Sequence, residues 1–258
     1  MSKCLAYSKE GCSESFVDHV ERVVAVWDML RPYYLLPVQR ALGVGGDPVL
    51  YAAVAHDFGK LALAYQDQGK KRHFYRHELL SAYFAYKCFE GPEEAKVAVS
   101  AAVWLHHEPI ITSAYITQLG ESYMPLYVVK RTLEFLQDEL VVGCDYQEVS
   151  SHVRKWNSCL AESLEQWAEK GLDIAEVMRI LKRVLVKATV GGIERAHVMR
   201  AKIAAVLYPL IVADGVAAYV GRAVCGRCGE EQRGTKVIRA ALCGAEPLDK
   251  AALLKLCR

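Results

Sequence analysis

The sequence predicts a mainly α-helical fold, and three observations indicate it. Apolar residues recur at helical spacing along most of the chain, few stretches alternate with the two-residue period of strands, and proline or glycine stands at most of the expected helix ends. The chain has 258 residues, of which 53% are hydrophobic, so it is long enough to bury one large core.

Each expected helix has its own signal. Apolar and charged residues alternate at helical spacing over 15–30. Asp47 followed by Pro48 is typical of a helix start, and the helix through VLYAAVAHDF should end at Gly59. Further helices are expected at 76–89, 93–106 (before Pro109), 125–140, 146–170, 173–189 and, after two glycines, from about 193 through Asp214. A short strand pair is expected near 232–243.

Residues 1–222 are expected to form one domain, and residues 223–258 a cysteine-containing appendage that could also belong to it. Nine cysteines are too few for a disulfide scaffold. A zinc site is one reading of a CxxC followed by two separate cysteines, namely Cys225, Cys228, Cys243 and Cys257. The wide second spacing favours buried thiols instead, or disulfides if the source is a hyperthermophile.

Charge and hydropathy bound the cellular setting. The net charge of +2 does not indicate a strongly basic nucleic-acid binder. The N-terminus lacks the apolar core of a signal peptide, so a cytoplasmic protein is expected. Residues 203–221 are nearly uncharged and long enough for a membrane span, but Pro209 and Asp214 favour a buried helix and no membrane contact.

Histidines and aspartates are the candidate functional residues. Six of the eight histidines lie in or beside helices that look buried: His19, His56, His77, His106, His107 and His197. Each alone is more often a satisfied core residue than a ligand. However, His56-Asp57 and His106-His107 are adjacent pairs near expected helix ends, where neighbouring side chains can diverge toward two metal ions that share Asp57. A carboxylate at Asp214, within an apolar helix, is costly unless paired or metal-bound.

These residues resemble a known superfamily. A histidine (His19), an adjacent His56-Asp57 and a distant Asp214 form a pattern similar to that of the HD phosphohydrolases. The ordered segments AYSKEG, SFVDHV, AHDFGK, YRHELLSAYF and WLHHEP, spanning about residues 4–220, resemble the stand-alone HD nuclease of type I CRISPR interference. The resemblance implies one metal held by His19, His56, Asp57 and Asp214, and a second held by Asp57, His77, His106 and His107.

The chemistry of the set suggests the metals and the reaction. Imidazole ligands favour manganese, iron, cobalt or nickel over magnesium. Two such ions could activate a water for attack on a phosphodiester, with Asp57 and Lys60 as catalytic residues. Lys60 could neutralise a phosphate or could be a solvated helix end. A basic stretch with aromatic residues could follow a nucleic-acid backbone or be an ordinary loop: Lys70, Lys71, Arg72 and Arg76.

The resemblance implies a metal-dependent nuclease that cleaves single-stranded DNA together with a separate helicase subunit and an RNA-guided surveillance complex. The alternative is an HD phosphohydrolase of deoxynucleoside triphosphates or cyclic nucleotides. A third reading is a non-catalytic helical scaffold with core histidines. The adjacent histidines and the RHELLSA segment favour the nuclease. The native metal, the balance of endo- and exonuclease activity, and the oligomeric state stay open.

Overall fold

Helices make up most of the chain, which confirms the predicted mainly α fold. The computed structural model describes residues 2–9, 12–67, 75–107, 126–189 and 192–224. Within these ranges, β structure is limited to one antiparallel strand pair and two isolated bridges. The predicted strand pair near 232–243, the cysteines from Cys225 onward, and Lys70, Lys71 and Arg72 lie outside the described residues.

The elements follow one another in a simple order. A short hairpin leads into a long helix, and further helices and 3-10 turns follow. Their bounds are β1 (Leu5–Lys9), β2 (Cys12–Ser15), α1 (Phe16–Leu42), α2 (Pro48–Ala55), η1 (Phe58–Leu61), α3 (Leu63–Gln66), α4 (His77–Cys88), α5 (Glu93–Leu105), α7 (Leu126–Phe135), η3 (Gln137–Glu139), α8 (Gln147–Val153), α9 (Ser158–Lys170), α10 (Ile174–Thr189) and α11 (Ile193–Val224).

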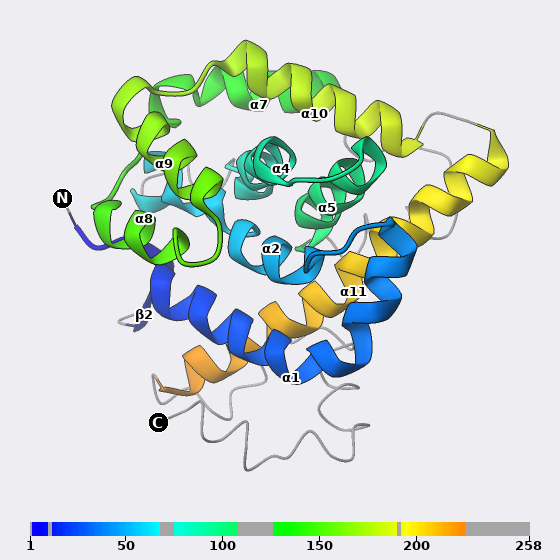
Figure 1. Ribbon diagram of the computed structural model, residues 1–258. Helices are drawn as coiled ribbons and strands as arrows, with labels where there is room; N and C mark the ends of the chain where they lie inside the picture. The colour runs from blue at the N-terminus through cyan, green and yellow to red at the C-terminus, as the bar shows by residue number, and fades with distance from the viewer. Residues whose placement is uncertain (1, 10–11, 68–74, 108–125, 190–191, 225–258) are drawn as a thin grey trace.

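The long helices α1 and α11 pack against each other, and α4 and α5 form the centre of the bundle (Figure 1). Helix α10 covers α4 and α5 from the opposite side, and α2 contacts α1, α11 and α5. One continuous core of aliphatic and aromatic side chains runs through these helices. The packing of α1 on α11 brings residues about 200 positions apart into contact.

Helix α1 extends twelve residues beyond the predicted end at Leu30 and reaches Leu42. The Ser15 side chain accepts a hydrogen bond from the Asp18 amide and caps the start of the helix. Pro32 and Pro37 do not end the helix; both lie on its exposed side, where a bend disturbs little packing. The helix stops at Gly43, whose φ of 68° is the left-handed conformation that glycine adopts readily.

The single helix predicted over 146–170 is wrong, because the structure has two. Helix α8 ends at Val153, and α9 begins at Ser158. Asn157 stands between them with extended backbone angles, and its side chain accepts a hydrogen bond from the Leu160 amide. An asparagine that caps a new helix therefore overrides the continuous apolar pattern. The hairpin β1–β2 was not predicted at all.

Part of α11, Ile193–Gly221, is long and apolar enough to cross a membrane by length and composition. Inside the fold, 61% of its most apolar window is buried. The helix packs against α1, α2 and α5, which accounts for its apolar composition as that of a core helix.

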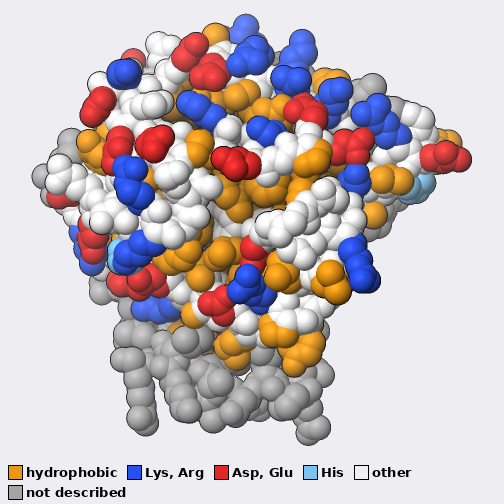
Figure 2. All heavy atoms as spheres, viewed as in Figure 1, with side chains coloured by type: hydrophobic (Ala, Val, Ile, Leu, Met, Phe, Trp, Pro, Cys, Tyr) orange, Lys and Arg blue, Asp and Glu red, His pale blue; other side chains and the backbone are white. Residues whose placement is uncertain are grey.

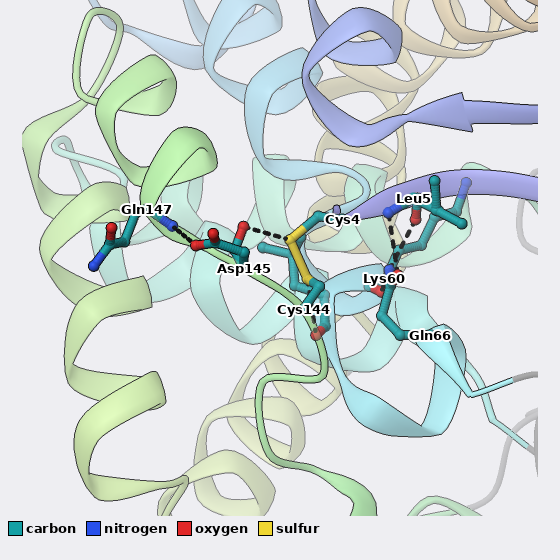
Figure 3. Close-up of a disulfide and its surroundings, with 8 residues drawn as sticks. Cys4, Leu5, Lys60, Gln66, Cys144, Asp145 and Gln147 are labelled. Atoms are coloured by element: carbon teal, nitrogen blue, oxygen red, sulfur yellow. Dashed lines mark hydrogen bonds between the residues drawn. A yellow bond between two sulfur atoms is a disulfide. The ribbon is translucent and has the colours of Figure 1, made fainter. Parts of the chain in front are cut away.

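Two disulfides join distant parts of the described chain. Cys4 pairs with Cys144, and Cys88 of α4 pairs with Cys159 of α9. The first disulfide lies where three segments meet (Figure 3). There, Gln66 bonds to the main chain of both Leu5 and Lys60, through its amide group. The chain around Lys60 is therefore fixed to the N-terminal hairpin and to the 141–145 segment, which also pairs with residues 61–63.

Charged side chains of both signs are interspersed over the face shown in Figure 2, which agrees with the small net charge. Lys and Arg side chains gather along its upper edge, where Figure 1 places α10. The exposed side of α10 carries four of them: Arg179, Lys182, Arg183 and Lys187.

Candidate metal centre

The adjacent residues His56 and Asp57 lie just beyond the end of a helix. Helix α2 ends at Ala55, four residues earlier than predicted. His56 keeps helical angles, but Asp57 has φ −107° and ψ 6°, and the chain then turns into η1. The second pair is placed in the same way, because α5 ends at Leu105 and His106 follows as its C-cap. Both pairs thus lie at the C-terminal end of a helix, and at Asp57 the backbone has already left the helical angles.

The structure brings all seven residues predicted as metal ligands into one cluster. They form two sets whose ligand atoms lie within 4.8 Å of one another. We call the first the Asp214 group and the second the His77 group. The Asp214 group contains His19, His56 and Asp214, and the His77 group contains Asp57, His77, His106 and His107.

Asp57 lies between the two groups, and each of its oxygens faces one of them. Its Oδ2 is 3.3 Å from the Nε2 atoms of both His19 and His56. Its Oδ1 is 3.2 Å from His77 Nε2 and 3.7 Å from His106 Nε2. A carboxylate placed in this way can offer one oxygen to each of two sets of ligands.

Asp214 closes the cluster from α11. Its Oδ1 is 3.2 Å from His19 Nε2 and 3.6 Å from His56 Nε2. Its Oδ2 is 3.9 Å from His107 Nδ1. The carboxylate is buried, and its neighbours are the predicted ligands, so the cost of placing it in an apolar helix is offset by these contacts.

Main-chain carbonyls orient two of the histidines. His56 Nδ1 lies 2.7 Å from the Ala53 carbonyl oxygen, and His106 Nδ1 lies 2.6 Å from that of Val103. In each case the carbonyl belongs to the last turn of the helix that the histidine follows. With Nδ1 donating to a carbonyl, Nε2 is left as the ligand atom, and it points into the cluster.

Unsatisfied polar atoms test whether a metal would fit. The buried Nε2 atoms of His19, His56, His77 and His106 have no hydrogen-bond partner, and neither does Asp57 Oδ1. Buried polar atoms are normally satisfied, and several orphans facing one another are costly. Imidazole nitrogens and carboxylate oxygens are ligands of divalent transition metals. The residues present therefore fit a metal centre.

The cluster strongly perturbs the acidity of its members. Burial by itself would raise the pKa of Asp57, but the charges of His56 and Lys60 outweigh it and hold that pKa well below its usual value. Burial by itself would also raise the pKa of Asp214, but contacts with His19 and His56 lower that pKa well below its usual value. Burial would lower the pKa of His56, but Asp57 and Asp214 raise it to about 9. The carboxylates are therefore ionised and attract cations.

Lys60 is not a solvated helix end, so that reading of the sequence is wrong. Lys60 is 8% exposed, and its Nζ donates to Asp57 Oδ2 over 2.7 Å. Burial would lower the pKa of Lys60, but the charge of Asp57 outweighs it and raises that pKa above its usual value. Lys60 therefore stays charged and fixes the side chain that both groups share.

The remaining predicted residues divide between the site and the surface. Arg76 precedes α4 directly beside His77, with its Nε 3.6 Å from Glu78 Oε2. Asp18, the neighbour of His19, is not one of the predicted ligands; it is exposed and accepts a hydrogen bond from the Ser15 hydroxyl. His197 was expected to be buried, which is wrong: it lies on an exposed part of α11.

Two buried glutamates beside the cluster were missed. Glu14 of β2 lies 3.4 Å from His19 Nδ1, and Glu78 of α4 lies 3.7 Å from His77 Nδ1. Glu78 stands within the RHELLSA segment but was assigned no role. Ser13 before Glu14 is exposed, but Ser15 after it is buried, so no period-two pattern in CSES indicated the inward side chain of Glu14.

Exposure varies across the cluster and shows which side is open. The side chains of His56, Asp57 and His106 are fully buried. That of His107 is 36% exposed, and those of Asp214 and His77 are 11% exposed. Solvent therefore reaches the cluster on the side of His107.

Gly59 holds His77 in place, and we expect Gly59→Ala to disturb both the fold and the cluster. An alanine Cβ here would lie 2.0 Å from the carbonyl oxygen of His77, a main-chain atom that can yield only if the start of α4 moves. The Gly59 amide also donates to Ser81 of α4. Overpacking of this kind costs about 1–3 kcal/mol. Denaturant unfolding measures the loss.

Gly45→Ala is the matched control, since a Cβ at Gly45 meets nothing within 4 Å. This control should unfold at the wild-type denaturant concentration. If Gly59→Ala matches it in stability and in metal content, then the close approach of Gly59 to α4 does not matter for the site.

Curated proteins similar to this chain share one name, while no family model matches it. The CRISPR-associated endonuclease Cas3-HD of Thermoproteus tenax is 33% identical over 214 residues, covering 83% of this chain and 89% of that protein. A protein of the same name from Methanocaldococcus jannaschii is 35% identical over 117 residues, 38% of this chain and 47% of that protein. The one from Pyrococcus furiosus is 27% identical over 133 residues, 46% of this chain and 56% of that protein.

Proposed function

This chain belongs to the Cas3-HD family of CRISPR-associated endonucleases, and from that premise we propose that it hydrolyses phosphodiester bonds of single-stranded DNA with two divalent metal ions. The observation that carries the proposal is the position of Asp57, with one carboxylate oxygen facing each histidine group. A site of this kind suits in-line displacement at phosphorus, which needs stabilisation of both the attacking and the leaving oxygen.

The seven ligands would be divided as the sequence pattern implies. His19, His56, Asp57 and Asp214 would hold one ion, and Asp57, His77, His106 and His107 the other. Bound divalent ions supply Lewis acidity, which makes water a stronger nucleophile at neutral pH and offsets charge on the phosphate oxygens. Five imidazoles against two carboxylates favour manganese, iron, cobalt or nickel over magnesium.

The protein itself contributes orientation and charge. Main-chain carbonyls direct Nε2 of His56 and His106 into the cluster, so these ligands need no rearrangement. Lys60 orients Asp57 and adds a fixed positive charge beside the scissile phosphate. Arg76, beside His77, would contact a backbone phosphate of the bound strand, as would Lys70, Lys71 and Arg72.

The open side of the cluster supports a polymeric substrate. His107 is the most exposed ligand, and a strand passing over it could present a phosphate to both groups. A single strand exposes its backbone without the bulk of a duplex. The small net charge fits an enzyme that receives DNA from other proteins, and we propose a separate helicase subunit and an RNA-guided surveillance complex as its partners.

Cleavage of circular single-stranded DNA tests the proposal. The metal-stripped protein should leave a labelled circle intact, and addition of manganese, nickel or cobalt should restore cutting more strongly than magnesium. Cutting of a circle identifies an endonuclease, since an exonuclease needs an end. Hydrolysis of free deoxynucleoside triphosphates or cyclic nucleotides, with circular DNA left intact, would instead identify a nucleotide phosphohydrolase.

A further inference from the structure

We propose that Glu14 positions His19 as a metal ligand. The inference rests on the proposed dinuclear site and concerns a residue outside its ligand set. Glu14 lies in β2, immediately before helix α1, and its side chain is buried. Its Oε1 faces His19 Nδ1 at 3.4 Å, on the side of the ring opposite the cluster.

The two nitrogens of His19 face different partners. Nε2 lies 3.3 Å from Asp57 Oδ2 and 3.2 Å from Asp214 Oδ1, so it points into the cluster. Nδ1 faces Glu14. A carboxylate that accepts from Nδ1 leaves Nε2 as the ligand atom and makes it a better electron donor. His19 Nδ1 makes no hydrogen bond at this distance, and Glu14 Oε1 is the acceptor that faces it. With that bond closed, Glu14 would have at His19 the role that the Ala53 carbonyl has at His56.

The rest of the fold holds Glu14 in that position. Arg22, one turn after His19 on α1, forms an ion pair with the same Oε1. Gly221 of α11 gives the carboxylate its space, since a Cβ at that position would lie 2.5 Å from Glu14 Oε1. Helices α1 and α11, which are far apart in the sequence, therefore fix the position of the buried Glu14 carboxylate. A carboxylate that only stabilised the fold would not need to point at a ligand nitrogen.

Manganese titration of the metal-stripped full-length chain tests the inference by calorimetry. Wild type should bind two ions. Glu14→Gln should weaken one of the two binding steps by about 10- to 100-fold, the usual effect of removing such a partner, and leave the other step unchanged. The selective loss is expected because His19 belongs to the Asp214 group alone. Glu14→Asp should recover part of the lost affinity.

A matched control is Glu21→Gln on α1, the helix that carries His19. Glu21 also contacts a histidine, His152, but it is 51% exposed and lies away from the cluster. Its substitution should leave both binding steps unchanged. The melting temperature of each metal-free variant shows whether the substitution destabilises the fold itself. A variant that melts as wild type but binds metal more weakly has lost a contribution to the metal site.

A second variant covers the case in which Glu14→Gln does not fold. Gly221→Ala retains Glu14 but pushes its carboxylate aside, and alanine suits a helix better than glycine does. It should weaken the same binding step. Wild-type affinity for both ions in Glu14→Gln, or in Gly221→Ala, would overturn the inference. Failure of wild type to bind any metal would overturn the proposed function instead.

Discussion

Asp57→Ala is expected to lower DNA cleavage by ~10³-fold or more and to remove bound metal from both groups. Asp57 is fully buried, and its two oxygens lie within 3.3 Å of histidines of both groups, whereas Asp214 reaches the His77 group only at 3.9 Å, from His107. In the proposed two-metal site, its loss would take a ligand from each ion and leave the Lys60 ammonium beside them without its counter-charge. Metal ions contribute several kcal/mol to charge stabilisation in the transition state, and about 4 kcal/mol corresponds to a factor of 10³.

Metal content by mass spectrometry and the rate of circular-DNA cleavage measure the effect. Asp57→Asn is the closest isostere, and it should fail in both assays because an amide carries no charge to share between two cations. Asp28→Ala, an exposed aspartate on α1, should behave as wild type. Normal metal content together with lost activity would assign Asp57 a role other than bridging.

Removal of the Cys4–Cys144 disulfide is expected to cause the largest loss of stability, because 140 residues separate its cysteines. Loss of a native disulfide costs about 2–5 kcal/mol, and the cost rises with the length of the closed loop. At roughly 2–4 °C per kcal/mol for a chain near this size, the double substitution Cys4→Ser/Cys144→Ser should lower Tm by about 5–20 °C.

The Cys88–Cys159 disulfide is the matched control, with a separation of 71 residues. Its removal should also lower Tm. Only the Cys4–Cys144 variant should weaken metal binding as well, because that disulfide lies where Gln66 fixes the Lys60 main chain (Figure 3). A Tm that does not respond to a strong reductant would contradict a stabilising role for both disulfides.

The local sequence pattern predicted correctly where several helices begin. The starts of α2, α4, α5 and α10 fall within one residue of expectation, because caps and apolar periodicity act over a few residues. The errors have a different origin. Helix α1 continues through Pro32 and Pro37 because its other face packs on α11, and such long-range packing overrides a local breaker.

The candidate ligands could be chosen from the sequence because the family pattern singles them out. The resemblance did not supply their surroundings. Lys60 was interpreted partly as a surface residue. Its burial depends on the turn at Asp57 and on the main-chain hydrogen bonds that join residues 61–63 to the 141–145 segment. Glu14 and Glu78 were missed because their partners, the Nδ1 atoms of His19 and His77, can be identified only from how the rings are turned.

The two ways of orienting the histidines have a consequence for protein engineering. His56 and His106 take their orientation from backbone carbonyls three residues earlier, which no side-chain substitution removes. His19 and His77 face the carboxylates of Glu14 and Glu78, which can be exchanged one at a time. One buried glutamate thus lies beside a histidine of each group, Glu14 at the Asp214 group and Glu78 at the His77 group. A designer could therefore tune the metal preference of each half independently, with the ligand atoms themselves unchanged.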